Sequence, residues 1–210
     1  MKKIKNYVVP KYIYAMWFTL VLAIGFGIYL QEWSTVFVSL MTLGISIYVI
    51  SLSRRIKIRI PASLLTASII FVYATLFLGE VGSFYERFWW WDVILHAGSA
   101  IGFGLIGAII LILLFHQGKV KTSPLLVSVF VFAFAVAIGA VWEIFEFSMD
   151  QLFGLSMQKS GLVDTMADLI VDSIGALLAA LASYAYLTKG RKSFLTAILE
   201  EAVAINSKYE

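Results

Sequence analysis

Six long apolar runs constrain the fold of this chain more than any other feature of its sequence. A helix needs about 20 apolar residues to cross a bilayer. Lipid offers peptide groups no hydrogen-bond partner, so a crossing segment must be a helix or part of a closed barrel, and the alternating pattern of barrel strands is missing here. We therefore predict an all-α polytopic membrane protein, a six-transmembrane-helix bundle. The predicted spans cover about residues 12–30, 34–52, 61–79, 93–115, 125–149 and 165–187.

The composition agrees with a membrane protein. Hydrophobic residues make up 61% of the 210 residues and charged residues only 14%, whereas about a quarter of the residues in soluble domains are charged. This length suits one integral membrane domain over residues 1–210. Apolar residues at helical spacing predict an amphipathic helix over residues 191–208 on the cytoplasmic membrane surface. The chain has no cysteine, which excludes disulfides and thiolate metal sites.

Lysine and arginine are concentrated on one of the two sides that six spans define. The side with both termini carries 14 of the 16 basic residues, and the other side carries only Arg87 and Lys159. Since cytoplasmic loops are rich in lysine and arginine, we expect both termini in the cytoplasm and the chain in a bacterial cytoplasmic (inner) membrane. These residues flank the spans as topology signals, so we expect membrane lipid, and no nucleic acid, as a partner. The 14 residues are Lys2, Lys3, Lys5, Lys11, Arg54, Arg55, Lys57, Arg59, Lys119, Lys121, Lys189, Arg191, Lys192 and Lys208.

Two sets of acidic residues lie at the outer ends of the last two spans, where lipid disfavours them. One acid at the centre of a helix costs about 2.5–3.5 kcal/mol on insertion scales, and less near the interface. Within each set the spacing is three or four residues, which places the side chains on one helix face. The connections are fairly short, so we expect the acids to meet His96 of the fourth span at a similar depth in the outer leaflet. The sets are Glu143, Glu146 and Asp150, and Asp164, Asp168 and Asp172.

Small residues on the last three spans indicate that these helices pack closely, because such residues let helix backbones approach. In the fourth span, Gly98 and Gly102 form one small-xxx-small pair, and Ala100 and Gly104 form another. The fifth and sixth spans add Gly139, Ala140, Gly175 and Ala179. We therefore expect the acid-bearing helices to be neighbours.

The acids have no lysine or arginine beside them, because the last three spans contain none. Carboxylates this close together cannot all be ionised unaided, so they either share protons or bind a cation. Carboxylates with one imidazole suit a divalent metal ion, whereas shared protons suit general acid–base chemistry or proton-coupled transport. The metal-ligand candidates are His96, Glu143, Glu146, Asp164, Asp168 and Asp172, and the catalytic candidates are Glu143, Glu146, Asp168 and His96.

Other polar and aromatic residues near the same ends have simpler interpretations. Asp92 and Asp164 stand where the fourth and sixth spans begin, and an acid at the positive end of a helix is expected to act as an N-cap. Asp150 lies at the water boundary, where a solvated carboxylate is expected. The run Trp89–Trp91 is typical of an interfacial aromatic belt.

The motifs of the second half resemble those of the YjdF-type family of bacterial inner-membrane proteins. They are His96-Ala97-Gly98, then Trp142-Glu143-Ile144-Phe145-Glu146-Phe147, then Asp164-Thr165-Met166-Ala167-Asp168. That family is similar, in its closing Asp-xxx-polar-xx-Gly helix, to the VanZ-like proteins linked to glycopeptide resistance. The resemblance covers mainly residues 92–180 and implies a small multi-span protein with a polar outer-leaflet site and no established reaction. The chain departs from the family pattern over 156–161, and at Asp172, where an asparagine or an apolar residue is expected.

Three functions remain open on this sequence. The first is a membrane enzyme or lipid-modifying protein whose outer-leaflet carboxylate and histidine centre depends on a metal and acts on a lipid or envelope substrate. The second is a small proton- or cation-coupled transporter or channel, although the acids cluster in one leaflet. The third is a structural membrane protein in which the acids are interhelical locks. We favour the first, because the acids have no basic counter-ions in the last three spans.

Overall fold

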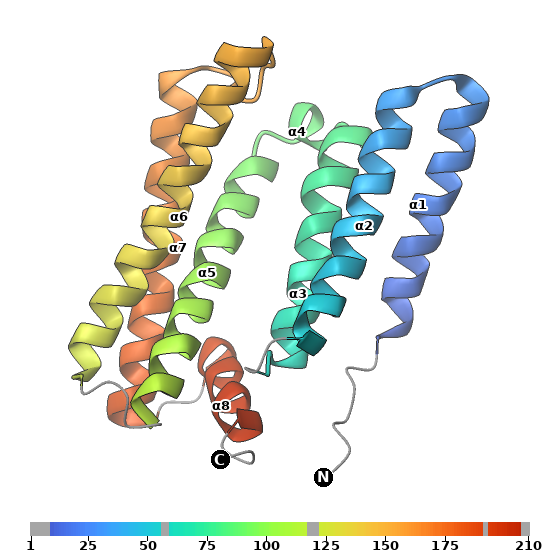
Figure 1. Cartoon of the computed structure of the whole chain (residues 1–210). Coiled ribbons are helices and arrows are strands. Elements are labelled where there is room, and N and C mark those ends of the chain that lie inside the picture. Colours follow the sequence, from blue (N-terminus) through green and yellow to red (C-terminus); the bar gives the residue numbers. More distant parts are fainter. Residues whose placement is uncertain (1–8, 56–58, 117–121, 191–192, 207–210) are drawn as a thin grey trace. The chain divides into compact units, whose positions relative to one another are not determined.

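The computed structural model describes residues 9–55, 59–116, 122–190 and 193–206. Over these residues the protein is helical and contains no β-strand (Figure 1). The elements are α1 (Lys11–Leu30), α2 (Trp33–Arg55), α3 (Ala62–Val72), the π-helix η1 (Tyr73–Val81), α4 (Phe84–Arg87), α5 (Trp91–His116), α6 (Pro124–Phe153), α7 (Leu162–Lys189) and α8 (Phe194–Asn206). Six helical segments are long and apolar enough to cross a membrane, with α3 and η1 together forming the third. The predicted all-α polytopic membrane fold is therefore confirmed.

The predicted spans agree with these helices to within a few residues, but the third differs in geometry. There the chain leaves regular α-helical geometry at Tyr73 and continues as η1 to Val81. Gly79 of η1 lies against the ring of Tyr85, and a Cβ atom at Gly79 would overlap that ring. Hydrophobic periodicity does not distinguish this wider π turn from an α-helix, so it could not be predicted from the sequence.

The chain divides into two compact units, the first ending at Trp91 and the second beginning at Asp92. In the first unit, α1 packs along α2, and α2 packs against α3 and η1. The buried core of this unit includes Ile13, Ile50, Leu65 and Ile69. That the whole chain forms one integral domain stays a prediction.

In the second unit, α6 and α7 pack along each other, and α8 packs against α7 (Figure 1). Helix α6 begins after Ser123, whose hydroxyl accepts a hydrogen bond from the N–H of Leu126 at 3.3 Å. Pro124 occupies its first turn, where a missing N–H costs nothing. Gly154 ends the helix in the left-handed conformation that glycine adopts without strain. Local sequence therefore marks both ends of this long helix.

Small residues bring α5 against α7, as predicted. A Cβ atom at Gly104 would lie 2.5 Å from the Cβ atom of Ala179. Gly98 and Gly102, by contrast, have no atom of the described residues within 4 Å of the place where a Cβ atom would lie, so this pair does not pack against α6 or α7. Two residues along a helix are about 200° apart. The two predicted pairs therefore lie on opposite faces of α5, and the face with Ala100 and Gly104 is the one that meets α7.

Helix α8 confirms the predicted C-terminal amphipathic helix. Ile198, Leu199 and Ala202 of its apolar face are buried, and the helix packs against α7. Protein therefore covers this face, and the position of α8 on the cytoplasmic surface stays a prediction. The outermost residues of the predicted helix, 191–192 and 207–208, lie outside the described residues.

Much of the topology prediction depends on residues that also lie outside the described part of the chain. The membrane orientation, with both termini in the cytoplasm, accordingly stays a prediction. The basic residues concerned are Lys2, Lys3, Lys5, Lys57, Lys119, Lys121, Arg191, Lys192 and Lys208.

Candidate functional site

His96 lies at the centre of a buried polar cluster formed by α5, α6 and α7. The residue is only 8% exposed. Its Nε2 atom lies 3.8 Å from Asp92 Oδ1, 4.0 Å from Glu143 Oε1 and 4.0 Å from Asp168 Oδ2. Asp92 stands one turn earlier on α5, while the other two carboxylates come from α6 and α7. The structure thus brings together side chains that the sequence places on three different helices.

Asp172 contacts the other nitrogen of the same ring. Its Oδ1 atom lies 3.3 Å from His96 Nδ1, and Asp172 is only 1% exposed. When Nδ1 donates its proton to Asp172, the lone pair of Nε2 faces the three other carboxylates. Metal-binding histidines are commonly held in this way by a carboxylate on their second nitrogen. Asp172, a candidate ligand in the sequence, has the position of a residue that orients the histidine.

Gly139 of α6 makes room for Asp172. A Cβ atom at Gly139 would overlap Asp172 Oδ2. That oxygen is buried and has no hydrogen-bond partner among the described residues. The sequence indicated Gly139 only as a small residue for close packing, and the structure shows that the Asp172 carboxylate occupies the space where a side chain would be.

Glu143 is the least satisfied side chain of the cluster. It is 4% exposed, and both of its carboxylate oxygens are buried without a hydrogen-bond partner among the described residues. A carboxylate buried in this way is costly unless a proton or a cation neutralises it. Ligand atoms of His96, Glu143 and Asp168 all lie within 4.8 Å of one another. Small side-chain movements would therefore close these three groups around one ion, whose bonds to nitrogen and oxygen are about 2.0–2.2 Å long.

Asp168 also belongs to a second group of acids. Ligand atoms of Asp92, Asp164 and Asp168 likewise lie within 4.8 Å of one another. Lys159 reaches this group from the loop before α7: its Nζ atom lies 3.6 Å from Asp92 Oδ2, and its backbone N–H donates to Asp164 Oδ2 at 3.0 Å. The sequence did not indicate this role of Lys159. The one available signal was that Lys159 is among only two basic residues on the predicted outer side.

Neither Asp92 nor Asp164 is an N-cap, which corrects the prediction for both. Helix α5 begins at Trp91, one residue before Asp92. Helix α7 begins at Leu162, and its N-cap residue is Gly161. The helices begin earlier than the apolar periodicity indicated, so both acids lie in a first helical turn. The positive helix end still favours an acid there.

Glu146 is not a member of either group found among the described residues. Its Oε1 atom accepts a hydrogen bond from Trp142 Nε1, one turn earlier on α6, at 2.9 Å. A step of three residues leaves two side chains about 60° apart around a helix. Glu143 therefore faces His96, while Glu146 turns towards Trp142, and the predicted catalytic and metal roles of Glu146 stay predictions.

Asp150 organises the loop between α6 and α7. Its two oxygens accept hydrogen bonds from the backbone N–H groups of Met157 at 2.7 Å and Gln158 at 2.9 Å. The amide nitrogen of Gln158 lies 2.5 Å from Thr165 Oγ1 in the first turns of α7. The expectation of a merely solvated carboxylate is therefore wrong, because the loop folds back over the end of α6 and supplies the donors.

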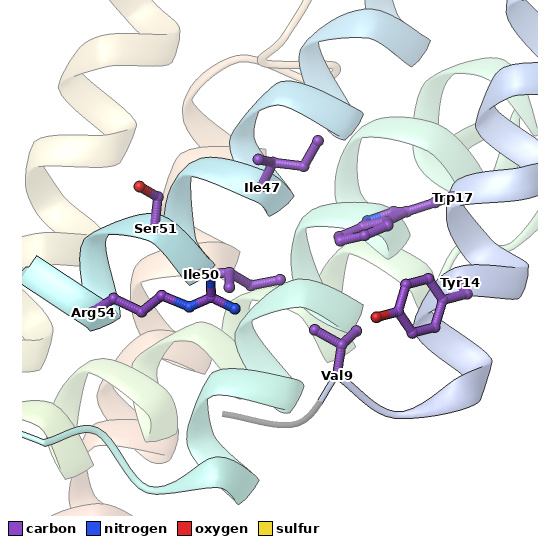
Figure 2. Close-up of a pocket in the computed structure, with 7 residues that line it drawn as sticks. All are labelled: Val9, Tyr14, Trp17, Ile47, Ile50, Ser51 and Arg54. Carbon is purple, nitrogen blue, oxygen red and sulfur yellow. The ribbon is translucent and has the colours of Figure 1, made fainter. Parts of the chain in front are cut away.

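The first unit contains a separate pocket of about 410 Å³ between α1 and α2 (Figure 2). Trp17, Ile47 and Ile50 give it apolar surface, and Arg54 is the one charged side chain among the described residues that line it. No histidine or acid is among those lining residues. This pocket therefore lacks the groups that metal binding or proton transfer would need, and the polar cluster remains the candidate site.

Comparison with known proteins gives a family but no activity. A family model described as "Predicted membrane protein (DUF2238)" matches residues 12–189. An uncharacterized protein of Thermotoga maritima is 31% identical over 137 residues, which cover 63% of this chain and 66% of that relative, slightly under two thirds of its length. No solved structure matches the chain. The comparisons do not confirm the YjdF-type and VanZ-like names, which stay a resemblance. The chain belongs to the DUF2238 family of predicted membrane proteins.

Proposed function

We propose that this protein is a metal-dependent protein of the bacterial cytoplasmic membrane, in which an ion bound by His96, Glu143 and Asp168 acts on a lipid or envelope substrate. The observation that carries the proposal is the buried carboxylate of Glu143, which has no hydrogen-bond partner among the described residues and lies beside an imidazole and a second carboxylate. A divalent ion would neutralise both carboxylates and accept the lone pair of Nε2. One histidine with two carboxylates suits Mn²⁺, Fe²⁺ or Zn²⁺.

The unpartnered oxygens favour a bound ion over an interhelical lock. A lock depends on hydrogen bonds, and Asp150 makes two of them with backbone N–H groups. Glu143 makes none among the described residues, so it would stabilise the helix packing only if something else neutralised it. Asp172 adds support, because its contact with His96 Nδ1 directs Nε2 towards the carboxylates.

The position of the cluster favours a substrate that approaches from the outer leaflet. The excess of lysine and arginine on the other side supports an orientation in which the N-terminal ends of α5 and α7 are on the outer side. Asp168 follows Asp164 by four residues, which places it about 6 Å deeper. Ile144 and Phe145, next to Glu143 in sequence, are 64% and 44% exposed. Lipid can therefore contact α6 at the level of the cluster.

Metal analysis of the purified full-length protein tests this function. We expect wild-type protein, purified without chelator, to hold stoichiometric metal, and chelated protein to rebind Mn²⁺ or Zn²⁺. Glu143→Gln and Asp168→Asn should abolish binding at this group. Glu146→Gln is a matched control, because the same substitution is made one turn away in a side chain bonded to Trp142, and it should leave binding intact. Folded wild-type protein that binds neither ion would overturn the proposal.

Lipid analysis of cells addresses the substrate. Membrane lipids and envelope precursors would be compared by mass spectrometry between cells that express wild type and cells that express Glu143→Gln. We expect at least one species to change with the wild type alone. Unchanged lipids together with gradient-driven uptake of Mn²⁺ into proteoliposomes would instead support the transporter alternative.

A further inference from the structure

We propose that the pocket between α1 and α2 binds one anionic phospholipid, with the phosphate at Arg54 and the upper part of an acyl chain against Trp17 and Ile47. The pocket has a volume of about 410 Å³, and these three residues line it. It belongs to the first unit, which ends at Trp91. The inference therefore goes beyond the proposed function and does not depend on the metal site of the second unit.

The pocket lies at the ends of its two helices, where a membrane span meets the lipid headgroups. Tyr14 lies in the first turn of α1, and Arg54 lies in the last turn of α2. Ile47 precedes Arg54 by seven residues, which places it about 10 Å deeper along the helix. A ligand that contacts both residues must therefore be polar at one end and apolar at the other, as a membrane lipid is.

Positive charge at this end of the first unit is not balanced by acidic residues. Arg54 forms no ion pair with a described residue, and Lys11 adds a second positive charge at the start of α1. The acids of this unit are Glu32, after the end of α1, Glu80, near the end of η1, and Glu86 in α4. All three lie towards the opposite ends of these helices, so the charge of the pocket complements an anion.

Two hydroxyl groups accompany the guanidinium. Figure 2 shows the side chains of Arg54 and Tyr14 pointing towards each other from the two helices, with Ser51 beside Arg54 on α2. Ser46 and Ser53 of α2 donate to carbonyl groups of their own helix at 2.8 and 2.7 Å, whereas the hydroxyls of Ser51 and Tyr14 make no hydrogen bond to a described residue. Arginine is the side chain that best matches a phosphate group, and free hydroxyls can donate to its remaining oxygens.

The deeper part of the pocket is apolar, which favours a lipid over a soluble anion. Trp17 Nε1 donates to Ser46 Oγ at 3.0 Å. The polar atom of the indole is thereby satisfied, and its ring offers the pocket apolar surface. Ile47 and Ile50 extend this surface along α2. An acyl chain would cover these side chains, and covering apolar surface is favourable, whereas inorganic phosphate would leave them uncovered.

Charge also distinguishes between possible occupants. Residues 1–8 carry Lys2, Lys3 and Lys5 and no acid, so this segment does not complement Arg54. The distribution of lysine and arginine supports an orientation in which the pocket faces the cytoplasmic leaflet. That leaflet carries anionic lipids, and basic pockets between membrane helices on this side bind their headgroups.

Native mass spectrometry of the full-length protein, titrated with phosphatidylglycerol or with zwitterionic phosphatidylethanolamine, tests the inference. Wild type should retain one phosphatidylglycerol and bind it more tightly than phosphatidylethanolamine. Arg54→Gln should weaken phosphatidylglycerol binding about fivefold, the contribution of one basic residue near a membrane surface. Arg55→Gln is the matched control, because Arg55 lies in the same last turn of α2 and does not line the pocket. It should leave the affinity unchanged.

A second variant distinguishes a lipid from a free anion. Ile47 is 48% exposed, so a larger side chain fits there without disturbing the core of the unit. Ile47→Trp should fill the apolar part of the pocket and weaken phosphatidylglycerol binding although Arg54 is retained. Inorganic phosphate should not compete with the lipid.

Three outcomes would overturn the inference. Equal affinity of wild type for the two lipids, or equal losses in Arg54→Gln and Arg55→Gln, would indicate general surface attraction. Competition by inorganic phosphate, with full affinity in Ile47→Trp, would indicate a site for a soluble anion. Dimers of wild type that dissociate in Arg54→Gln would indicate that a second copy of the chain covers the pocket. Metal content should stay the same in all three variants, so none of these outcomes bears on the proposed function.

Discussion

Replacing Glu143 with glutamine is expected to have opposite effects on stability with and without metal. In chelated protein, Glu143 is a buried carboxylate without a hydrogen-bond partner among the described residues. Glutamine has nearly the same shape and no charge. An unsatisfied buried polar group costs about 1–3 kcal/mol, and a charged one costs more. The amide is still an unpartnered polar group, so the substitution removes only the extra cost of the charge, and chelated Glu143→Gln should be more stable than chelated wild type by about 1 kcal/mol.

Added metal should make wild type more stable than Glu143→Gln, the reverse of their order in chelator. An ion that binds only the folded state stabilises it by about 2.7 kcal/mol at a concentration 100 times the dissociation constant. Wild type should gain this amount from Mn²⁺, while Glu143→Gln has lost one of the three proposed ligands of the ion and should gain much less. For a chain of this length, each kcal/mol corresponds to about 2–4 °C in melting temperature. Each shift should therefore be several degrees.

Thermal unfolding in one detergent, with chelator or with Mn²⁺, measures both shifts in the same preparation. Glu146→Gln controls for the effect of replacing a glutamate with glutamine on α6. Glu146 accepts a hydrogen bond from Trp142 and lies outside both acid groups. This control should keep the full metal-dependent shift. The reasoning would be refuted if Glu143→Gln were less stable than wild type in chelator and Mn²⁺ shifted neither protein. That result would indicate a structural role for the Glu143 carboxylate.

Four further predictions follow from contacts around the cluster. Asp172→Asn should weaken metal affinity about 10–100-fold without changing stoichiometry, as loss of a carboxylate behind a metal-binding histidine does; calorimetric titration measures both values. Gly139→Ala should produce a similar loss, because its Cβ atom would displace the Asp172 carboxylate from His96, and unchanged affinity would contradict this contact. Asp150→Ala should loosen the loop before α7, since each hydrogen bond from a backbone N–H to its carboxylate contributes about 1.5–3 kcal/mol; faster hydrogen exchange at Met157 would show it, with metal stoichiometry unchanged. Metal affinity should fall as the pH is lowered, because protons compete for the imidazole and the carboxylates, and titrations at several pH values would detect an affinity that does not change.

Local sequence was enough to predict the membrane fold. Apolar composition decides whether a segment enters lipid, and it acts through each stretch of about 20 residues by itself. The six spans therefore agree with the helices to within a few residues. Because the apolar pattern is a local signal, it did not locate the first residue of each helix correctly. Asp92 and Asp164 looked like caps because the apolar runs begin beside them, yet both helices begin one or two residues earlier.

The spacing of the acids was also enough to indicate that a buried polar cluster forms around His96. Helical periodicity placed Asp164, Asp168 and Asp172 on one face, and the antiparallel order of the spans brought that face to the depth of His96. Periodicity within one helix does not reveal how a neighbouring helix is rotated about its axis. That rotation depends on packing between helices, for instance of Gly104 against Ala179.

Tertiary structure therefore decided the role that each acid can take. It directed Glu143 towards His96 and turned Glu146 towards Trp142. It put Asp172 against the second ring nitrogen, in the space left by Gly139. These assignments depend on distances between atoms far apart in the sequence, and only the packed helices determine those distances.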